Sequence, residues 1–311
     1  MRTIVAVALL VLATSWAFAP DARYDVLVTG STVFDGEADV PRPARIGIRD
    51  GRIVTLTAAA GATADRTIDA GDHVVAPGFI DPHTHAGRAL ADPATSANQH
   101  YLAQGVTTVF IGNDGGGVPG GPDALARMRD HGTGTNVAWF AGHGAIRSAV
   151  MGRDDRKPTS AELDAMRTAV SDDMQAGALG LSSGLYYVPG NYADTDEVVA
   201  LAEVTRPFGG VYDTHLRDEG SYGIGLAAAV DEAIEIARRA GVPAHISHIK
   251  ALGPDVRGAA ADIVARVNRA RDDGLAITAN QYPWRASGTR LSNALIPRDA
   301  LAGSPERFFE R

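Results

Sequence analysis

The sequence predicts an α/β protein whose main part is a (β/α)8, TIM-like barrel that stops after about seven strands, with a small β domain before it. Two observations support this prediction. From about residue 76, short β-branched runs alternate with alanine-rich helical stretches, which is the pattern of a parallel sheet with helical crossovers. Before that point, strand and turn signals occur without any helical period.

Residues 1–19 have the pattern of a signal peptide. Arg2 is followed by the apolar run Ile4–Ala17, and Ala17-Phe18-Ala19 fits a small-x-small cleavage motif. Pro20 directly after this motif leaves the position of the cut open. The alternative is an uncleaved membrane anchor, but the apolar run is short for a full span. We therefore expect a periplasmic or secreted protein with no stable membrane span after cleavage.

Residues 20–75 are expected to form the N-terminal part of a small, β-sandwich-like domain. Asp25–Thr29 has the composition of a strand, and Gly30-Ser31 marks a turn after it. Ile46–Val54 predicts a hairpin, because Asp50-Gly51 between apolar residues is a strong hairpin signal.

Residues 76–311 are expected to form the barrel. Thr159 and Glu162 resemble a capping box for a helix over Ser160–Gln175, and Gly241 is a suitable stop for a helix over Leu226–Ala240. Seven strand–helix units favour a barrel over a doubly wound sheet. The candidate strands are Val74–Ile80, Thr107–Gly112, Asn136–His143, Ala178–Gly184, Gly210–Leu216, Pro243–Lys250 and Ala276–Tyr282. Because Ser304–Arg311 resembles the middle of a helix, we expect the barrel to be incomplete at the C-terminus.

The composition excludes several kinds of site. The sequence has no cysteine, so it forms no disulfide and no thiolate metal site, and any metal must be held by histidine, carboxylate or main-chain groups. A formal net charge of −8 and the lack of a basic run argue against a nucleic-acid partner. Gly112–Gly121 lacks the Gly-Lys-Ser/Thr ending of a phosphate loop, so a tight strand-to-helix loop is the better interpretation.

Five potential metal ligands fall at the predicted carboxyl ends of strands, where barrel enzymes place their active residues. His83 and His85 are two residues apart on an extended chain, so both side chains are expected to point to one side. By the same alternation, His248 and Lys250 are expected to share one face of their strand, opposite to Ser247. The residues expected to converge at one rim are His83, His85, Asp114, His215 and His248.

The stretch Gly78–His85 resembles the first-strand motif of the amidohydrolase superfamily. Further stretches resemble its N-acyl-D-amino-acid deacylase, or D-aminoacylase, branch: Gly142–Gly144, Gly177–Gly190, Thr214–Arg217, Ile246–Lys250 and Gln281–Trp284. The resemblance runs from about Tyr24 to Pro297. It implies an enzyme that uses zinc, as one or two divalent cations, to hydrolyse a small-molecule N-acyl-D-amino acid to a D-amino acid and a carboxylate.

The resemblance also implies roles for individual residues. His83 and His85 match ligands of a more weakly held zinc, and His215 and His248 match ligands of a tightly held zinc. Asp114 stands where relatives have a bridging cysteine; a carboxylate can also bridge two cations, although it leaves the metal preference open. The implied substrate-binding residues are Lys250, Tyr282 and Ser287, which match residues that hold the α-carboxylate, and Tyr187, in the loop that approaches it. His143, whose family counterpart is not a ligand, is expected to support the ligands from a second layer or to be a core residue, and Asn113 is expected to orient the ligands or their loop.

One departure leaves alternatives open. The family places a catalytic aspartate in a Ser-Asp-Gly context at strand eight, and no such motif follows Tyr282, so no catalytic residue is assigned here. Within the same superfamily, a D-aminoacyl dipeptidase or a cyclic-amide hydrolase is the enzymatic alternative. A truncated metal-binding remnant without catalysis is the other alternative.

Overall fold

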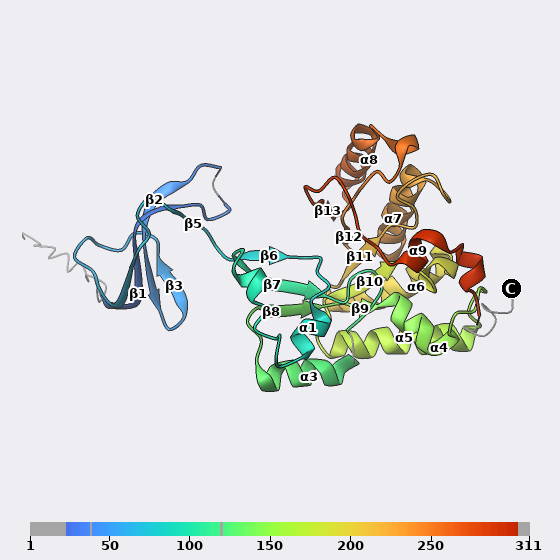
Figure 1. Cartoon of the computed structure of the whole chain (residues 1–311), viewed down its shortest axis with the longest axis horizontal. Helices are drawn as coiled ribbons and strands as arrows, with labels where there is room; N and C mark the ends of the chain where they lie inside the picture. The colour runs from blue at the N-terminus through green and yellow to red at the C-terminus, as the bar shows by residue number, and fades with distance from the viewer. Residues whose placement is uncertain (1–22, 38, 119–120, 304–311) are drawn as a thin grey trace, which may run out of the picture. The chain divides into compact units, whose positions relative to one another are not determined.

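The computed structural model describes residues 23–37, 39–118 and 121–303. The predicted signal peptide, 1–19, and the helix expected over 304–311 lie outside this described part. The chain divides into two compact units, Met1–Pro77 and Gly78–Arg311. Figure 1 shows the elements of both units. Among the described residues, no helix has both the length and the apolar character needed to cross a bilayer.

The described residues of the first unit form one five-stranded sheet in the order β3-β2-β1-β4, with β5 also paired to β1. Its strands are β1 Arg23–Val33, β2 Arg42–Arg49, β3 Arg52–Thr55, β4 Thr63–Asp69 and β5 Val74–Val75. The predicted hairpin is confirmed, because β2 and β3 pair antiparallel on either side of Asp50 and Gly51. Both turn residues have positive φ, 51° and 69°, as a type I′ turn requires. The second layer of a sandwich stays a prediction.

The second unit consists of parallel strands connected by helices. The strands pair as β6-β7-β8 and as β13-β12-β11-β10-β9, and only Phe140 separates β8 from β9 in the sequence. The strands are β6 Phe79–Asp81, β7 Val106–Ile111, β8 Asn136–Trp139, β9 Ala141–Gly142, β10 Gly180–Gly184, β11 Val211–His215, β12 Ala244–Ile246 and β13 Ile277–Ala279. Because all pairings are parallel, the carboxyl ends of neighbouring strands lie at the same edge.

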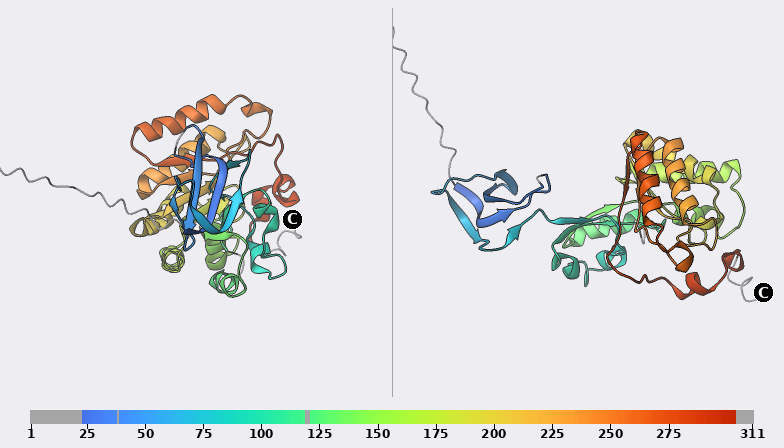
Figure 2. Two further views of the ribbon diagram at one scale, coloured as in Figure 1. Left: turned by 90° about the vertical axis from the view of Figure 1, so that its left-hand side faces the viewer. Right: turned by 90° about the horizontal axis from the view of Figure 1, so that it is seen from above.

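The helices of this unit lie outside the strands, as the two views of Figure 2 also show. They are α1 Gly87–Ala91, α2 Gln99–Leu102, α3 Gly121–His131, α4 His143–Met151, α5 Ser160–Gln175, α6 Thr195–Thr205, α7 Leu226–Ala240, α8 Ala260–Asp272 and α9 Leu291–Leu295. Short 3-10 turns η1 Gly190–Tyr192, η2 Arg206–Phe208, η3 Pro254–Val256 and η4 Arg298–Leu301 complete the connections.

The predicted boundaries of α5 and α7 are confirmed. Thr159 and Glu162 form a complete capping box at the start of α5. Gly241 ends α7 in the left-handed conformation. The buried face of α7 repeats every three or four residues, from Leu226 through Val230 and Ile234 to Ala237, which is the spacing of a helix packed on a sheet.

One predicted strand is divided between the two units. The run Val74–Ile80 was expected to be continuous, but Val74–Val75 pairs with β1 and Phe79–Asp81 pairs with β7. The physical reason lies in Pro77-Gly78 between them, since proline cannot donate to a strand ladder and glycine weakens a strand interior.

Candidate metal centre

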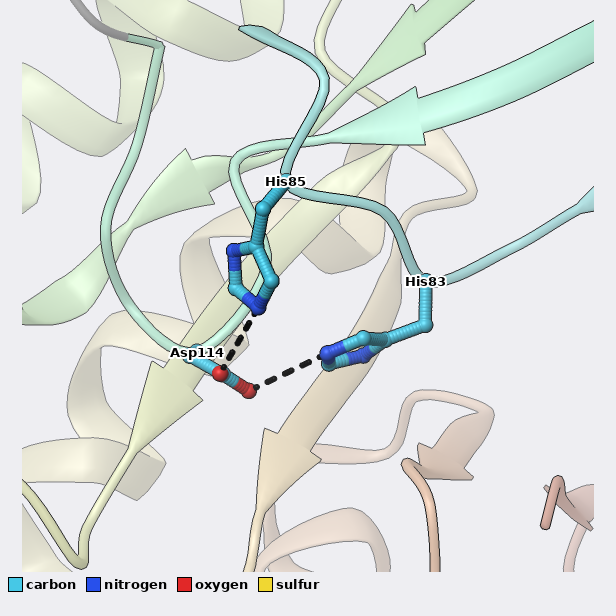
Figure 3. A group of neighbouring side chains, drawn as sticks. All are labelled: His83, His85 and Asp114. Carbon is cyan, nitrogen blue, oxygen red and sulfur yellow. Dashed lines mark ion pairs between the residues drawn. The ribbon is translucent and has the colours of Figure 1, made fainter. Parts of the chain in front are cut away.

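Asp114 lies among four histidines that come from three different parts of the second unit. His83 and His85 follow β6, Asp114 follows β7, His215 ends β11 and His248 follows β12. The Nε2 atoms of His83 and His85 each lie 3.5 Å from an Asp114 carboxylate oxygen, one on Oδ1 and the other on Oδ2 (Figure 3). The structure therefore brings the histidines after β6 to opposite oxygens of one carboxylate.

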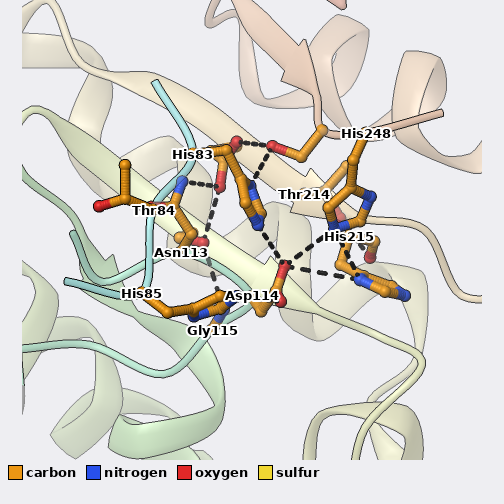
Figure 4. Close-up of polar contacts among 12 residues, drawn as sticks. His83, Thr84, His85, Asn113, Asp114, Gly115, Thr214, His215 and His248 are labelled. Atoms are coloured by element: carbon orange, nitrogen blue, oxygen red, sulfur yellow. Dashed lines mark hydrogen bonds and ion pairs between the residues drawn. The ribbon is translucent and has the colours of Figure 1, made fainter. Parts of the chain in front are cut away.

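The other two histidines approach the same carboxylate. His215 Nδ1 lies 3.5 Å and His248 Nε2 lies 3.4 Å from Asp114 Oδ1, and these two ring nitrogens are 3.0 Å apart (Figure 4). The five residues thus form two candidate metal-binding groups, and Asp114 belongs to both. All five residues that the sequence singled out as ligands lie together here.

The protonation states of His83 and Asp114 fit a divalent cation. Burial lowers the pKa of His83 to about 3, with only partial opposition from Asp114, so the ring is neutral and offers a lone pair. Burial opposes ionisation of Asp114, but the neighbouring rings of His215, His248 and His85 outweigh it and hold the pKa of the carboxyl far below its usual range. His83 Nε2, His215 Nε2 and Asp114 Oδ1 are buried without a hydrogen-bond partner, which is the state expected of atoms that coordinate a cation.

The backbone at the cluster is held in a rarely populated conformation. Asp114 and His248 have φ values of 56° and 38°, in the left-handed region that residues other than glycine seldom adopt. Such strain persists only where the surroundings hold it, and it concentrates at functional sites. Part of the support is Gly184, where an added Cβ would lie 2.2 Å from the main-chain oxygen of Asp114.

A buried carboxylate, Asp213, is connected to the ligand candidate His83 through the hydroxyl of Ser247. Ser247 Oγ donates to Asp213 Oδ1 at 2.6 Å and lies 2.9 Å from His83 Nδ1. Because the single hydroxyl proton of Ser247 goes to Asp213, His83 must donate from Nδ1, which leaves its Nε2 lone pair facing Asp114. Ser182 and Asn113 donate to the other oxygen, Oδ2.

The same network fixes the loop that carries Asp114. Asn113 also donates to the main-chain oxygen of Pro82, and the amide of Gly115 donates to Ser182 Oγ. Asn113 therefore connects the segments that carry His83 and Asp114. Burial raises the pKa of Asp213 to about 6, and the hydrogen bonds from Ser247 and Ser182 oppose this rise only in part.

Sequence reasoning missed Asp213 and Glu219. A signal for Asp213 existed, because it alternates with His215 along β11 and so faces the same side. Glu219 lies in the loop after β11 and carried no such signal. It forms an ion pair with Lys250, and its Oε1 lies 3.5 Å from His215 Nε2 and from His248 Nδ1.

The prediction from strand alternation was wrong for Ser247. It placed Ser247 on the face opposite to His248 and Lys250, yet Ser247 contacts His83. The physical reason is that β12 ends at Ile246, and His248 then turns through positive φ, so strict alternation stops. His248 and Lys250 do lie together, with Lys250 Nζ 3.0 Å from His248 Nδ1.

The expected substrate-binding residues line one cavity of about 750 Å³ together with the five metal-ligand candidates. These residues are Lys250, Tyr282, Ser287 and Tyr187. Lys250 Nζ lies 5.9 Å from the centre of the Tyr282 ring, and the ring of Tyr187 lies 4.6 Å from that of His215. The cavity thus joins hydroxyl groups and a cation to the histidine cluster.

His143 lies elsewhere. It is fully buried at the start of α4, and its Nε2 is 2.9 Å from Glu197 Oε1. Arg147 donates to the same carboxylate and to the main-chain oxygens of Asp154 and Arg156. The structure shows His143 in a buried charge cluster with no hydrogen bond to the five ligand candidates.

Comparison with known proteins gives the class of this chain. No protein-family model matches it. It is 34% identical to an N-acyl-D-glutamate deacylase of Alcaligenes xylosoxydans xylosoxydans over 86% of this chain and 59% of the relative. It is 33% identical to a D-aminoacylase of the same organism over 90% of this chain and 61% of the relative.

Solved structures agree with these relatives. The crystal structure of a D-aminoacylase described as defining a subset of amidohydrolases matches with a TM-score of 0.77 and 31% identity, covering 84% of this chain and 59% of that one. The N-acyl-D-glutamate deacylase of Bordetella bronchiseptica, complexed with zinc and a phosphonate inhibitor, matches with a TM-score of 0.78 and 31% identity over the same shares.

The chain is therefore a homologue of the amidohydrolases. Its relatives within that superfamily are a D-aminoacylase and N-acyl-D-glutamate deacylases, as the motifs after its strands predicted. The chain spans about 60% of the length of these relatives.

Proposed function

We propose that this chain carries the metal centre of a deacylase that hydrolyses the amide of an N-acyl-D-amino acid, releasing a D-amino acid and a carboxylate. The observation that carries the proposal is Asp114, which belongs to two candidate metal-binding groups, one with His83 and His85 and one with His215 and His248. Relatives with the corresponding activity in their names support it.

The proposed ligands are His83, His85, Asp114, His215 and His248, and the proposed occupant is zinc, as one or two divalent cations. Imidazole and carboxylate together suit zinc and other first-row divalent cations. When bound, such a cation polarises a carbonyl oxygen and makes a water more acidic. The support for zinc is the ligand chemistry and the zinc complex of a relative.

The residues of the cavity would hold the substrate around this centre. We propose that Tyr282 and Ser287 orient a substrate carboxylate by hydrogen bonding, and that Tyr187 closes the cavity beside His215. Lys250 would add a positive charge, which Glu219 partly neutralises in this structure. No residue of the described part of the chain is proposed as the proton-transfer group.

Two proposals about the whole chain accompany this function. The parallel strands β6 to β13 are proposed to be part of a (β/α)8 barrel, supported by their pairing and by the likeness to D-aminoacylase. Residues 1–19 are proposed to direct the protein to the periplasm or the medium, and the N-terminal residue of the protein purified from its host tests this.

Metal binding and hydrolysis test the proposed function together. Titration with Zn²⁺ should show stoichiometric binding that His248→Ala reduces strongly and that His100→Ala, an exposed histidine on α2, leaves unchanged. Zinc-loaded protein should release D-amino acids from an N-acetyl-D-amino-acid panel. Release only from dipeptides or cyclic amides would replace this substrate class, and zinc binding without any turnover would favour the non-catalytic alternative.

A further inference from the structure

Glu219 is a buried carboxylate that lies beside two metal-ligand candidates without belonging to either candidate metal-binding group. Only 4% of its surface is exposed. Its Oε1 atom lies 3.5 Å from His248 Nδ1 and 3.5 Å from His215 Nε2, and it forms an ion pair with Lys250. A carboxylate in such a position can control the ring of a ligand without binding the metal itself.

The loop after β11 holds Glu219 in place. The preceding residue, Asp218, is buried, and its carboxylate accepts hydrogen bonds from the main-chain amides of Gly220 and Gly223. The main-chain oxygen of Glu219 accepts a hydrogen bond of 2.7 Å from the amide of Leu252. Because hydrogen bonds fix the backbone around Glu219, the loop sets the position of its carboxylate.

The ring of His248 can carry its proton in two ways. Its Nε2 atom lies 3.4 Å from Asp114 Oδ1, and its Nδ1 atom lies 3.0 Å from Lys250 Nζ. A neutral imidazole has one proton. If Lys250 donates to Nδ1, the ring proton is on Nε2, and no lone pair faces Asp114. If the proton is on Nδ1, the Nε2 lone pair can bind a cation, but the lysine ammonium cannot accept that proton.

Glu219 favours the second of these tautomers. Among the partners of His248 Nδ1 in the described part of the chain, Glu219 Oε1 is the one that can accept a hydrogen bond. The same carboxylate binds the ammonium of Lys250 and so competes with His248 for this donor. The ring is neutral in both tautomers, so the choice between them needs no change of charge.

We propose that Glu219 is a positioning residue for metal binding, which accepts the Nδ1 proton of His248 and holds Lys250, so that the Nε2 lone pair of His248 faces the cation. This inference rests on the proposed function, because that function makes His248 a ligand. A carboxylate behind a metal-bound histidine fixes both the tautomer and the orientation of the ring.

The position of the ring proton tests the inference directly. Nitrogen-15 NMR of the metal-free full chain, at a pH at which the ring of His248 is neutral, shows which nitrogen carries the proton, and the spectrum of His248→Gln identifies the signals. We expect the proton on Nδ1 in the wild type and in Glu219→Gln, whose amide oxygen still accepts it. In Glu219→Ala we expect it on Nε2, because Lys250 then donates to Nδ1. A proton on Nε2 in the wild type, or on the same nitrogen in the wild type and Glu219→Ala, would overturn the inference.

Zinc affinity gives a second measurement. Calorimetric titration should show that Glu219→Ala binds Zn²⁺ about 10- to 100-fold more weakly than the wild type, the usual effect of residues that orient ligands. Glu235→Ala, which removes a glutamate on α7 that pairs with Arg238, is the control and should leave the affinity unchanged. Equal affinity of the wild type and Glu219→Ala would overturn the inference alone. Failure of the wild type to bind Zn²⁺ would overturn the proposed function as well.

A second pair of variants covers the case in which Glu219→Ala does not fold because Lys250 is left unpaired. Lys250→Met removes that charge, and Lys250→Met combined with Glu219→Leu removes the whole ion pair. The double variant should bind Zn²⁺ about tenfold or more weakly than Lys250→Met alone. Equal affinity of these two proteins would contradict a role for Glu219 at His248.

Discussion

The Nε2 atom of His248 lies 3.4 Å from the Oδ1 atom of Asp114, and both residues hold positive φ values. Two separate turns, one after β7 and one after β12, are thus held in an unfavourable conformation to place these two side chains together. The strain is consistent with a precise requirement on ligand position.

Removal of the shared carboxylate should affect both candidate metal-binding groups. We expect Asp114→Ala to weaken Zn²⁺ binding by more than about 100-fold, which exceeds the usual effect of residues that only orient ligands. Calorimetric titration with Zn²⁺ measures this change, with Asp123→Ala on α3 as the control. Unaltered zinc affinity in Asp114→Ala would show that the carboxylate is no ligand.

Loss of the support behind His83 should weaken metal binding without removing a ligand. Ser247→Ala and Asp213→Asn should each lower Zn²⁺ affinity by about 10- to 100-fold, because His83 is then free to change tautomer. Ser183→Ala is a matched control, since its hydroxyl is equally buried but bonds to Tyr212 and Thr214. If Ser183→Ala matched Ser247→Ala, general packing would explain the loss instead.

The buried carboxyl of Asp213 should leave a signature in the pH dependence of stability. Its folded pKa is raised to about 6 from 3.8, so the folded state binds the proton more tightly and this group's stabilisation is lost as pH rises from about 4 to 6. The amide of Asp213→Asn does not titrate. In metal-free protein, the free energy of unfolding of Asp213→Asn relative to that of the wild type should therefore increase by about 3 kcal/mol between pH 4 and pH 7.

Urea unfolding at each pH measures that gain. His83 titrates in the same range with the opposite sign, since its pKa is lowered, so the comparison uses the difference between two proteins that both contain His83. Asp164→Asn, at an exposed position on α5, is the control. A constant difference between Asp213→Asn and wild type across this range would contradict the prediction.

The buried cluster of Glu197, Arg147 and His143 should stabilise the folded state. Glu197→Ala leaves the fully buried guanidinium of Arg147 without its carboxylate, and breaking such a pair typically costs about 3–5 kcal/mol. Chemical denaturation measures the loss. Asp196→Ala on the same helix removes an exposed partner of Arg239 and should shift the midpoint far less. Comparable shifts in the two variants would rule out a special role for burial.

Local sequence signals predicted the elements whose ends depend on short-range chemistry. Thr159, Glu162 and Gly241 gave helix boundaries that the structure confirms, because capping involves residues a few positions apart. The parallel arrangement also followed from the alternation of strands and helices. The division of Val74–Ile80 between two sheets did not, because strand pairing partners are distant in the sequence.

The ligand candidates were predictable because they lie at the carboxyl ends of parallel strands, and these ends lie at the same edge of the sheet. Glu219 was not, since it reaches the site from a loop, where no periodicity fixes the direction of a side chain. Ser247 was misplaced because the backbone turn at His248 ends the alternation that the argument assumed. The backbone turn at His248 depends on residues distant in the sequence, such as Asn280, which accepts a hydrogen bond from the His248 amide.

Gly184 is a residue without functional groups that limits where the main chain of Asp114 can lie. Its hydrogen atom faces the carbonyl of Asp114 where a methyl group would collide with it. An engineer who varies only the charged and aromatic residues would leave this position untouched. Yet even a methyl group there would require the main chain of Asp114 to shift, so the tolerance of this position to alanine reports how closely the position of the shared carboxylate must be kept.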